Sequence, residues 1–137
     1  MHKAVIDTNV MISSLFGGKP AEVMRRWRDG KLTLCLSDGI MAEYLEVLAR
    51  FERLSASAID DLLVLFADPQ RVILAEPTER IEEVAADPAD NMSLECAVAA
   101  GADIIISGDS HLLSLGAFRG IPMVSPGDFL QAVAGEP

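Results

Sequence analysis

A regular alternation of short apolar runs with helical patterns is the feature that most constrains the fold of this chain. The apolar runs predict short strands at residues 4–6, 32–36, 71–74, 104–106 and 122–124. The segments between them predict helices at residues 20–29, 37–51, 55–66, 91–100 and 127–133. Continuously apolar strands separated by helices indicate a parallel sheet that is buried on both faces. We therefore expect an α/β fold, a three-layer α/β/α sandwich with a mostly parallel central sheet.

The length and hydropathy of the chain favour a single domain, residues 1–137. Half of the residues are apolar, which is enough for one core. The longest clear apolar run, residues 62–67, has six residues, whereas a membrane span needs about 18. The start of the chain also lacks the apolar stretch of a secretory signal. We therefore expect a soluble, cytoplasmic protein.

The cysteines and the net charge limit the kind of site that the chain can form. Cys35 and Cys96 lie in apolar surroundings, and we expect buried thiols rather than a disulfide framework or a zinc site. The net charge of −10 is unfavourable for nucleic-acid binding, because phosphate affinity comes mostly from Lys and Arg. An acidic balance fits a basic partner, a carboxylate metal site or solubility alone.

Acidic residues stand where a parallel sheet would bring them together. Asp7 directly follows the first predicted strand, and Asp109 follows the fourth after a Ser-Gly pair. The carboxyl ends of parallel strands meet at one edge of a sheet, where α/β proteins bind their ligands. Glu43 lies beside the apolar face of its helix, and Asp90 lies on the packed side at the start of another. Both can reach the same edge.

Four carboxylates at one edge repel one another, and a divalent cation would remove that conflict. Oxygen ligands favour Mg²⁺ or Mn²⁺ over zinc, so we expect one of these ions at the four acids. The two histidines, His2 and His111, are expected at the surface rather than among the ligands.

Each acid also has an ordinary structural interpretation. Asp7 and Asp109 can be turn residues, and Asp90 can be a helix-start acid. Glu43 can be solvated or can pair with Arg50. These alternatives stay open from the residues alone, although one shared site explains all four positions together.

Short blocks that contain these acids occur in a fixed order, at residues 5–10, 37–48, 87–91, 94–97 and 102–109. In these blocks the chain resembles the PIN domain family, closest to the stand-alone toxin components of bacterial and archaeal toxin–antitoxin systems. The resemblance extends from about residue 3 to residue 130. It implies that the catalytic and metal-binding acids are Asp7, Glu43, Asp90 and Asp109, with Asn9, Ser107 and Asp87 as supporting residues.

The same resemblance implies a metal-dependent endoribonuclease that hydrolyses RNA phosphodiester bonds with Mg²⁺ or Mn²⁺. We expect Asp7 and Asp109 to be the central ligands and Asp90 to complete the coordination. Glu43 is expected to bind the metal or to orient the attacking water. The resemblance further implies an RNA substrate, an antitoxin protein as partner, and a homodimer.

The segment of residues 19–31 is locally basic, with five of the eleven Lys and Arg residues against two acids. Trp27 could stack on a base, but a core or interface anchor is its more ordinary role. Leu62, Leu63 and Leu65 fit either an interface or the core. The candidate RNA contacts, which a solvated helix face also explains, are Arg25, Arg26, Arg28 and Lys31.

Two other functions fit parts of the sequence. The start of the chain and Asp109 are loosely similar to haloacid-dehalogenase-type phosphatases, but Asn9 stands where those enzymes need a second aspartate. They also need a downstream lysine, and the last lysine here is Lys31. The other alternative is a non-catalytic PIN-fold binding partner, which a lack of metal affinity would favour.

Overall fold

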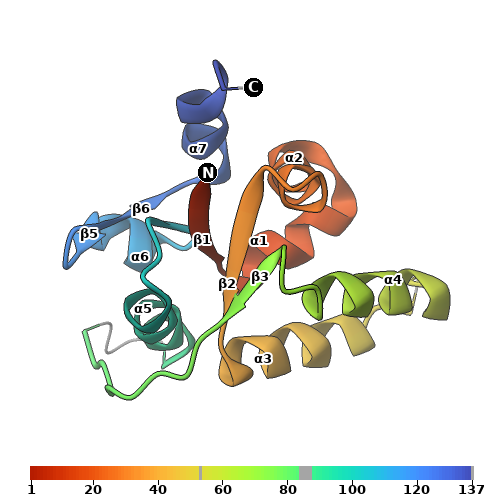
Figure 1. Ribbon diagram of the computed structural model, residues 1–137, viewed down its shortest axis with the longest axis horizontal. Coiled ribbons are helices and arrows are strands. Elements are labelled where there is room, and N and C mark those ends of the chain that lie inside the picture. Colours follow the sequence, from red (N-terminus) through yellow and green to blue (C-terminus); the bar gives the residue numbers. More distant parts are fainter. Residues whose placement is uncertain (53, 84–87, 137) are drawn as a thin grey trace.

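The computed structural model describes residues 1–52, 54–83 and 88–136, and a six-stranded sheet forms its centre (Figure 1). The strand order is β3-β2-β1-β4-β6-β5, and every neighbouring pair is parallel except β5 with β6. The expected mostly parallel α/β sheet is confirmed, and each predicted strand is present. The strands are β1 (His2–Ile6), β2 (Leu32–Leu36), β3 (Val72–Leu74), β4 (Ile104–Ile106), β5 (Ala117–Phe118) and β6 (Ile121–Val124).

Helices cover both faces of the sheet, which gives the expected three layers. In Figure 1, α1 and α2 lie on one side of the sheet and α5 lies on the other. The helices are α1 (Thr8–Ser13), α2 (Gly18–Arg28), α3 (Asp38–Ala49), α4 (Ala56–Phe66), α5 (Pro88–Ala100), α6 (Ser110–Leu115) and α7 (Pro126–Val133), with a 3-10 turn, η1 (Ser14–Phe16), before α2. Within the described ranges, no helix is long and apolar enough to cross a membrane.

Local chemistry explains where the predicted helices begin and end. Ser37 accepts a hydrogen bond from the N–H of Ile40 at the start of α3, and Ser55 caps α4 in the same way. Gly101 follows α5 with a φ of 65°, a conformation that glycine adopts at helix ends without a steric cost. These boundaries agree with the sequence prediction to within a few residues.

The sequence prediction lacks two short helices, α1 and α6, and the two-residue strand β5. Each helix has only six residues, which is too short for a clear 3.6-residue period. Both begin at an acid: Asp7 accepts from the N–H of Val10, and Asp109 accepts from the N–H of His111. The two strand-end acids are therefore helix caps, and this role fixes the direction of their side chains.

The apolar core surrounds β1, which lies between β2 and β4. Cys35 on β2 and Cys96 on α5 are buried free thiols, as expected. Burial raises the pKa of Cys35 to about 11 and that of Cys96 to about 12, so both stay uncharged at neutral pH. On α4, Leu62 is buried in the core, whereas Leu63 is 39% exposed.

The register of the central strands sets the position of the site. Ile6, the last residue of β1, pairs with Ile106, the last residue of β4. The residues that follow the two strands, Asp7 and Ser107, therefore lie side by side at the carboxyl edge of the sheet. This is the edge at which the sequence predicts the acids to meet.

Candidate functional site

Ser107 connects the two strand-end acids. The fully buried Ser107 hydroxyl donates a hydrogen bond to Oδ2 of Asp7. The same Oγ accepts a hydrogen bond of 2.9 Å from the backbone N–H of Asp109. One hydroxyl thus hydrogen-bonds both to the Asp7 carboxylate and to the backbone of the turn that carries Asp109.

Asp7 is a buried carboxyl group with a fixed orientation. Its Oδ1 accepts a hydrogen bond of 3.0 Å from the N–H of Val10, and only 6% of the residue is exposed. Burial raises the pKa of Asp7, the hydrogen bonds from Ser107 and Val10 lower it, and the charge of Asp109 raises it. The surroundings therefore leave the ionised form of Asp7 less stable than that of an ordinary carboxylate, and a cation would offset the difference.

Two of the other predicted acids share a pocket of about 110 Å³ with Asp7. Glu43 reaches it from α3, and the buried Asp90 reaches it from the first turn of α5. The described residues that line this pocket include no Lys, Arg or His, and they are Asp7, Thr8, Asn9, Glu43, Ala89, Asp90 and Ser93. The described part of the lining is therefore acidic.

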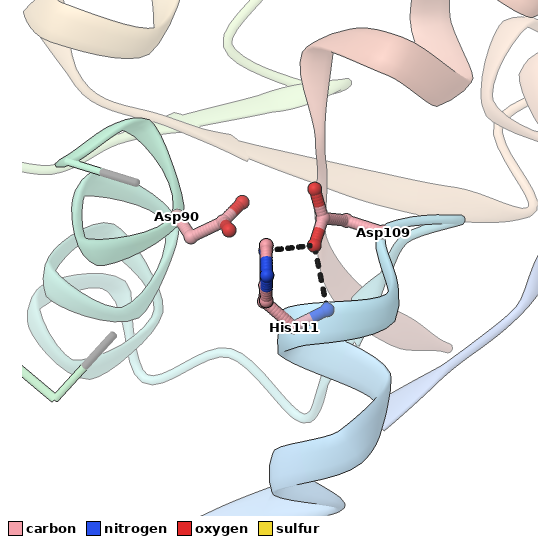
Figure 2. A group of neighbouring side chains, drawn as sticks. All are labelled: Asp90, Asp109 and His111. Carbon is pink, nitrogen blue, oxygen red and sulfur yellow. Dashed lines mark hydrogen bonds and ion pairs between the residues drawn. The ribbon is translucent and has the colours of Figure 1, made fainter. Parts of the chain in front are cut away.

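The fourth acid, Asp109, lies next to Asp90 with His111 between them (Figure 2). One possible ligand atom from each of the three residues lies within 4.8 Å of those of the other two. Nδ1 of His111 is 3.3 Å from Oδ1 of Asp109. The structure thus brings all four predicted acids to one edge of the sheet.

This arrangement fits a divalent cation. Carboxylates come together from the residue after β1, from α3, from α5 and from the turn before α6. Like charges held close together are costly, and carboxylate oxygens are the ligands that Mg²⁺ and Mn²⁺ take in proteins. The donor set therefore suits the metal type that the sequence predicts.

The remaining supporting residues have different positions. Asn9 is exposed and lines both the acidic pocket and a neighbouring pocket of about 410 Å³. Asp87 lies outside the described residues. Ser93, which is buried and lines the acidic pocket, is absent from the sequence prediction. Its position three residues after Asp90 places both on one helix face, and this spacing is a signal that could have identified it.

The basic residues proposed as RNA contacts lie at the opposite edge of the sheet. The three arginines occupy the last turn of α2, and Lys31 directly precedes β2. The first residue of β2 pairs with His2, the first residue of β1, so β2 begins at the amino end of β1. Asp7, in contrast, follows the last residue of β1 at its carboxyl end. The five residues of β1, at about 3.3 Å each, separate these edges by about 16 Å. The structure does not bring these four residues to the acids: Arg25, Arg26, Arg28 and Lys31.

Trp27 is a core residue. Its side chain is fully buried, and its ring stacks on Phe66 with the centroids 5.4 Å apart. The indole N–H donates a hydrogen bond of 3.0 Å to the carbonyl oxygen of Arg71. The interpretation of Trp27 as a base-stacking residue is therefore wrong, because no face of the ring is open to a base.

The raised pKa of Asp7 predicts that its effect on stability depends on pH. Asp7 ionises at a lower pH in the unfolded chain than in the folded protein, so the unfolded state binds fewer protons between the two pKa values. The Asp7 contribution to the free energy of unfolding should fall as pH rises from about 4 through the folded pKa. Urea titrations of wild type and Asp7→Asn in EDTA, from pH 4 to 8, measure it. A difference between the two that stays constant with pH contradicts this prediction.

Known proteins share this fold. The model of the family described as "PIN domain" matches residues 3–111. The crystal structure of PAE2754 from Pyrobaculum aerophilum is similar with a TM-score of 0.62 and 16% identity, over 98% of this chain and 91% of that chain. The crystal structure of VapBC2 from Rickettsia felis bound to a DNA fragment from its promoter is also similar, with a TM-score of 0.59 and 11% identity. The match covers 90% of this chain and 98% of that chain. No curated protein sequence matches the chain.

Proposed function

The chain belongs to the PIN domain family, whose members are generally metal-dependent nucleases, and we propose that it is an endoribonuclease that hydrolyses RNA phosphodiester bonds. The observation that carries this proposal is the convergence of four carboxylates at the carboxyl edge of the sheet. Family membership leaves no place for the phosphatase alternative. The non-catalytic alternative remains to be separated by experiment.

We assign separate tasks to the site residues. Asp7, Asp90 and Asp109 hold the divalent ion, and Glu43 holds it or orients the attacking water. Ser107 keeps the carboxylate of Asp7 in position. When bound, Mg²⁺ or Mn²⁺ lowers the pKa of a water and neutralises charge on the phosphate.

An RNA substrate also needs a contact for its backbone, and Lys19 is in position to provide one. Lys19 lines the pocket of about 410 Å³ that contains Asn9 and Gly108, the direct neighbours of the acidic site. It forms no ion pair with a described residue, whereas Arg26 pairs with Glu136 at 3.7 Å. We propose that Lys19 binds a phosphate beside the cleaved bond.

Replacing Lys19 by glutamine is expected to weaken RNA binding and leave kcat nearly unchanged. Loss of one phosphate contact to a single strand should reduce the slope of log K against log salt by about 0.7. Fluorescence anisotropy with a labelled RNA at several salt concentrations measures this slope. Lys31→Gln is the matched control, because Lys31 lies at the opposite edge of the sheet. Equal losses in the two variants would contradict a specific contact by Lys19.

We further propose that the chain is the toxin of a toxin–antitoxin pair, with an antitoxin protein as its partner, and that it forms a homodimer. The shared fold with the Rickettsia felis VapBC2 structure supports the antitoxin proposal. Exposed apolar side chains on α4, Val64 at 70% and Leu63 at 39%, are available for a protein interface. Leu62 is not available, because it belongs to the core.

The experiment that tests the proposed function is cleavage of a mixed single-stranded RNA pool with Mn²⁺, Mg²⁺ or EDTA. Cleavage in either metal and its loss in EDTA are expected. Calorimetric titration with Mn²⁺ distinguishes the alternatives when cleavage is absent. A protein that neither cuts RNA nor binds metal would overturn the nuclease proposal in favour of the non-catalytic binding partner.

A further inference from the structure

His111 lies inside the acidic site rather than elsewhere on the surface. Its ring points into the space between Asp90 and Asp109 (Figure 2). The side chain remains 56% exposed, so the sequence expectation of a surface residue is confirmed. The sequence analysis also expected His111 not to be a metal ligand. Exposure of the side chain does not establish this, because an exposed imidazole can still reach the acids beside it.

The spacing of the three side chains suits a single ion. Ligand atoms from Asp90, Asp109 and His111 lie within 4.8 Å of one another. An octahedral ion with bonds of about 2.1 Å holds adjacent ligand atoms about 3 Å apart and opposite ones about 4.2 Å apart. Side-chain shifts of less than about 1 Å therefore bring all three atoms within the reach of one ion.

The backbone, and not the ring, of His111 completes the helix start. The N–H of His111 donates a hydrogen bond of 2.7 Å to Oδ1 of Asp109, which caps α6. Any residue at position 111 except proline keeps this bond. The imidazole is therefore not needed for the cap and is free to serve another role.

We propose that His111 is a nitrogen ligand of this metal site and makes the site prefer Mn²⁺ to Mg²⁺, an inference that rests on the proposed metal-dependent function. Mg²⁺ takes oxygen ligands and gives up water reluctantly. Imidazole nitrogen binds first-row transition ions more readily, and an oxygen-only site lacks this source of selectivity.

The test is binding of the metal alone. Calorimetric titrations of the metal-free protein with Mn²⁺ and with Mg²⁺, at one fixed pH, give the ratio of the two affinities. His111→Asn should lower the Mn²⁺ affinity about tenfold or more and change the Mg²⁺ affinity by less than about threefold. His2→Asn is the matched control, because His2 lies at the start of β1 and pairs with Glu136. Thermal unfolding without metal checks that each variant is folded.

Pulsed electron paramagnetic resonance of bound Mn²⁺ gives a second readout. Coupling to an imidazole nitrogen is expected in wild type and His2→Asn, and its absence is expected in His111→Asn. Bound Mn²⁺ without nitrogen coupling, or an unchanged affinity ratio in His111→Asn, would overturn the inference. If Asp109→Asn still abolishes metal-dependent cleavage in that case, the proposed function stands. Nitrogen-coupled Mn²⁺ in a protein that cuts no RNA would support the ligand role of His111 without supporting the proposed function.

Discussion

Replacing Asp7 by asparagine is expected to reduce metal-dependent RNA cleavage by about a thousandfold or more. Asparagine keeps the shape of the side chain and its hydrogen-bond acceptor for Val10, but it removes the negative charge that a metal ion needs. Initial cleavage rates of a single labelled RNA in saturating Mn²⁺, for wild type and variant, measure the effect. Asp109→Asn should have an effect of similar size, because it also removes a proposed central ligand.

The same variant separates a role in the site from a role in the scaffold. In metal-free buffer at neutral pH, Asp7→Asn should be at least as stable as wild type, with a gain of about 0.5–2 kcal/mol. The reason is that burial and the charge of Asp109 both disfavour the ionised carboxylate. Asp103→Asn is the control, since Asp103 is exposed at the opposite end of β4, where it accepts from the N–H of Lys3. A large loss of stability in Asp7→Asn would show that Asp7 is structural.

Replacing Trp27 by alanine is expected to destabilise the protein by about 3–5 kcal/mol. The substitution leaves a cavity under α2, removes the stacking on Phe66, and leaves the carbonyl of Arg71 without its indole donor. Urea unfolding followed by circular dichroism measures the free energy of unfolding. Because a marginally stable domain has about 5–15 kcal/mol in total, the variant loses a large part of its stability.

A surface aromatic residue provides the comparison for Trp27. Phe16 is 72% exposed, and its ring lies 5.8 Å from that of Phe51. Phe16→Ala should cost about 1 kcal/mol or less. If Trp27→Ala is as stable as Phe16→Ala but loses RNA affinity, then the assignment of Trp27 to the core is wrong.

The sheet was predictable because its signals are local. The three isoleucines of β4 and the apolar run of β2 are continuous, and continuous apolar runs occur in strands buried on both faces. The serine caps of α3 and α4 likewise act within three residues of the chain. In contrast, α1 and α6 are too short for periodicity to show them.

The acids of the site could also be named in advance, because strand ends and helix starts restrict where such residues point. Asp7 directly follows β1, and Asp109 lies a few residues after β4. These two strands pair with each other. Ser93 was missed because a serine alone is not distinctive, and its spacing of three residues from Asp90 was the one signal that could have identified it. The positive segment around α2 was visible as composition, but composition does not state at which edge of the sheet a charge lies.

The sequence by itself determined the strands of the parallel α/β sheet and the placement of acids after strands and at helix starts, since both depend on short-range patterns. Tertiary structure alone decided which basic residues lie beside those acids and which histidine enters the site. Lys19 lies in the first turn of α2 at the acidic edge, and the arginines lie in its last turn at the other. His111 points into the space between Asp90 and Asp109 because α6 starts at Asp109 and the first turn of α5 brings Asp90 close to both. Such contacts join residues far apart in the chain, and their distances follow from packing rather than from sequence spacing.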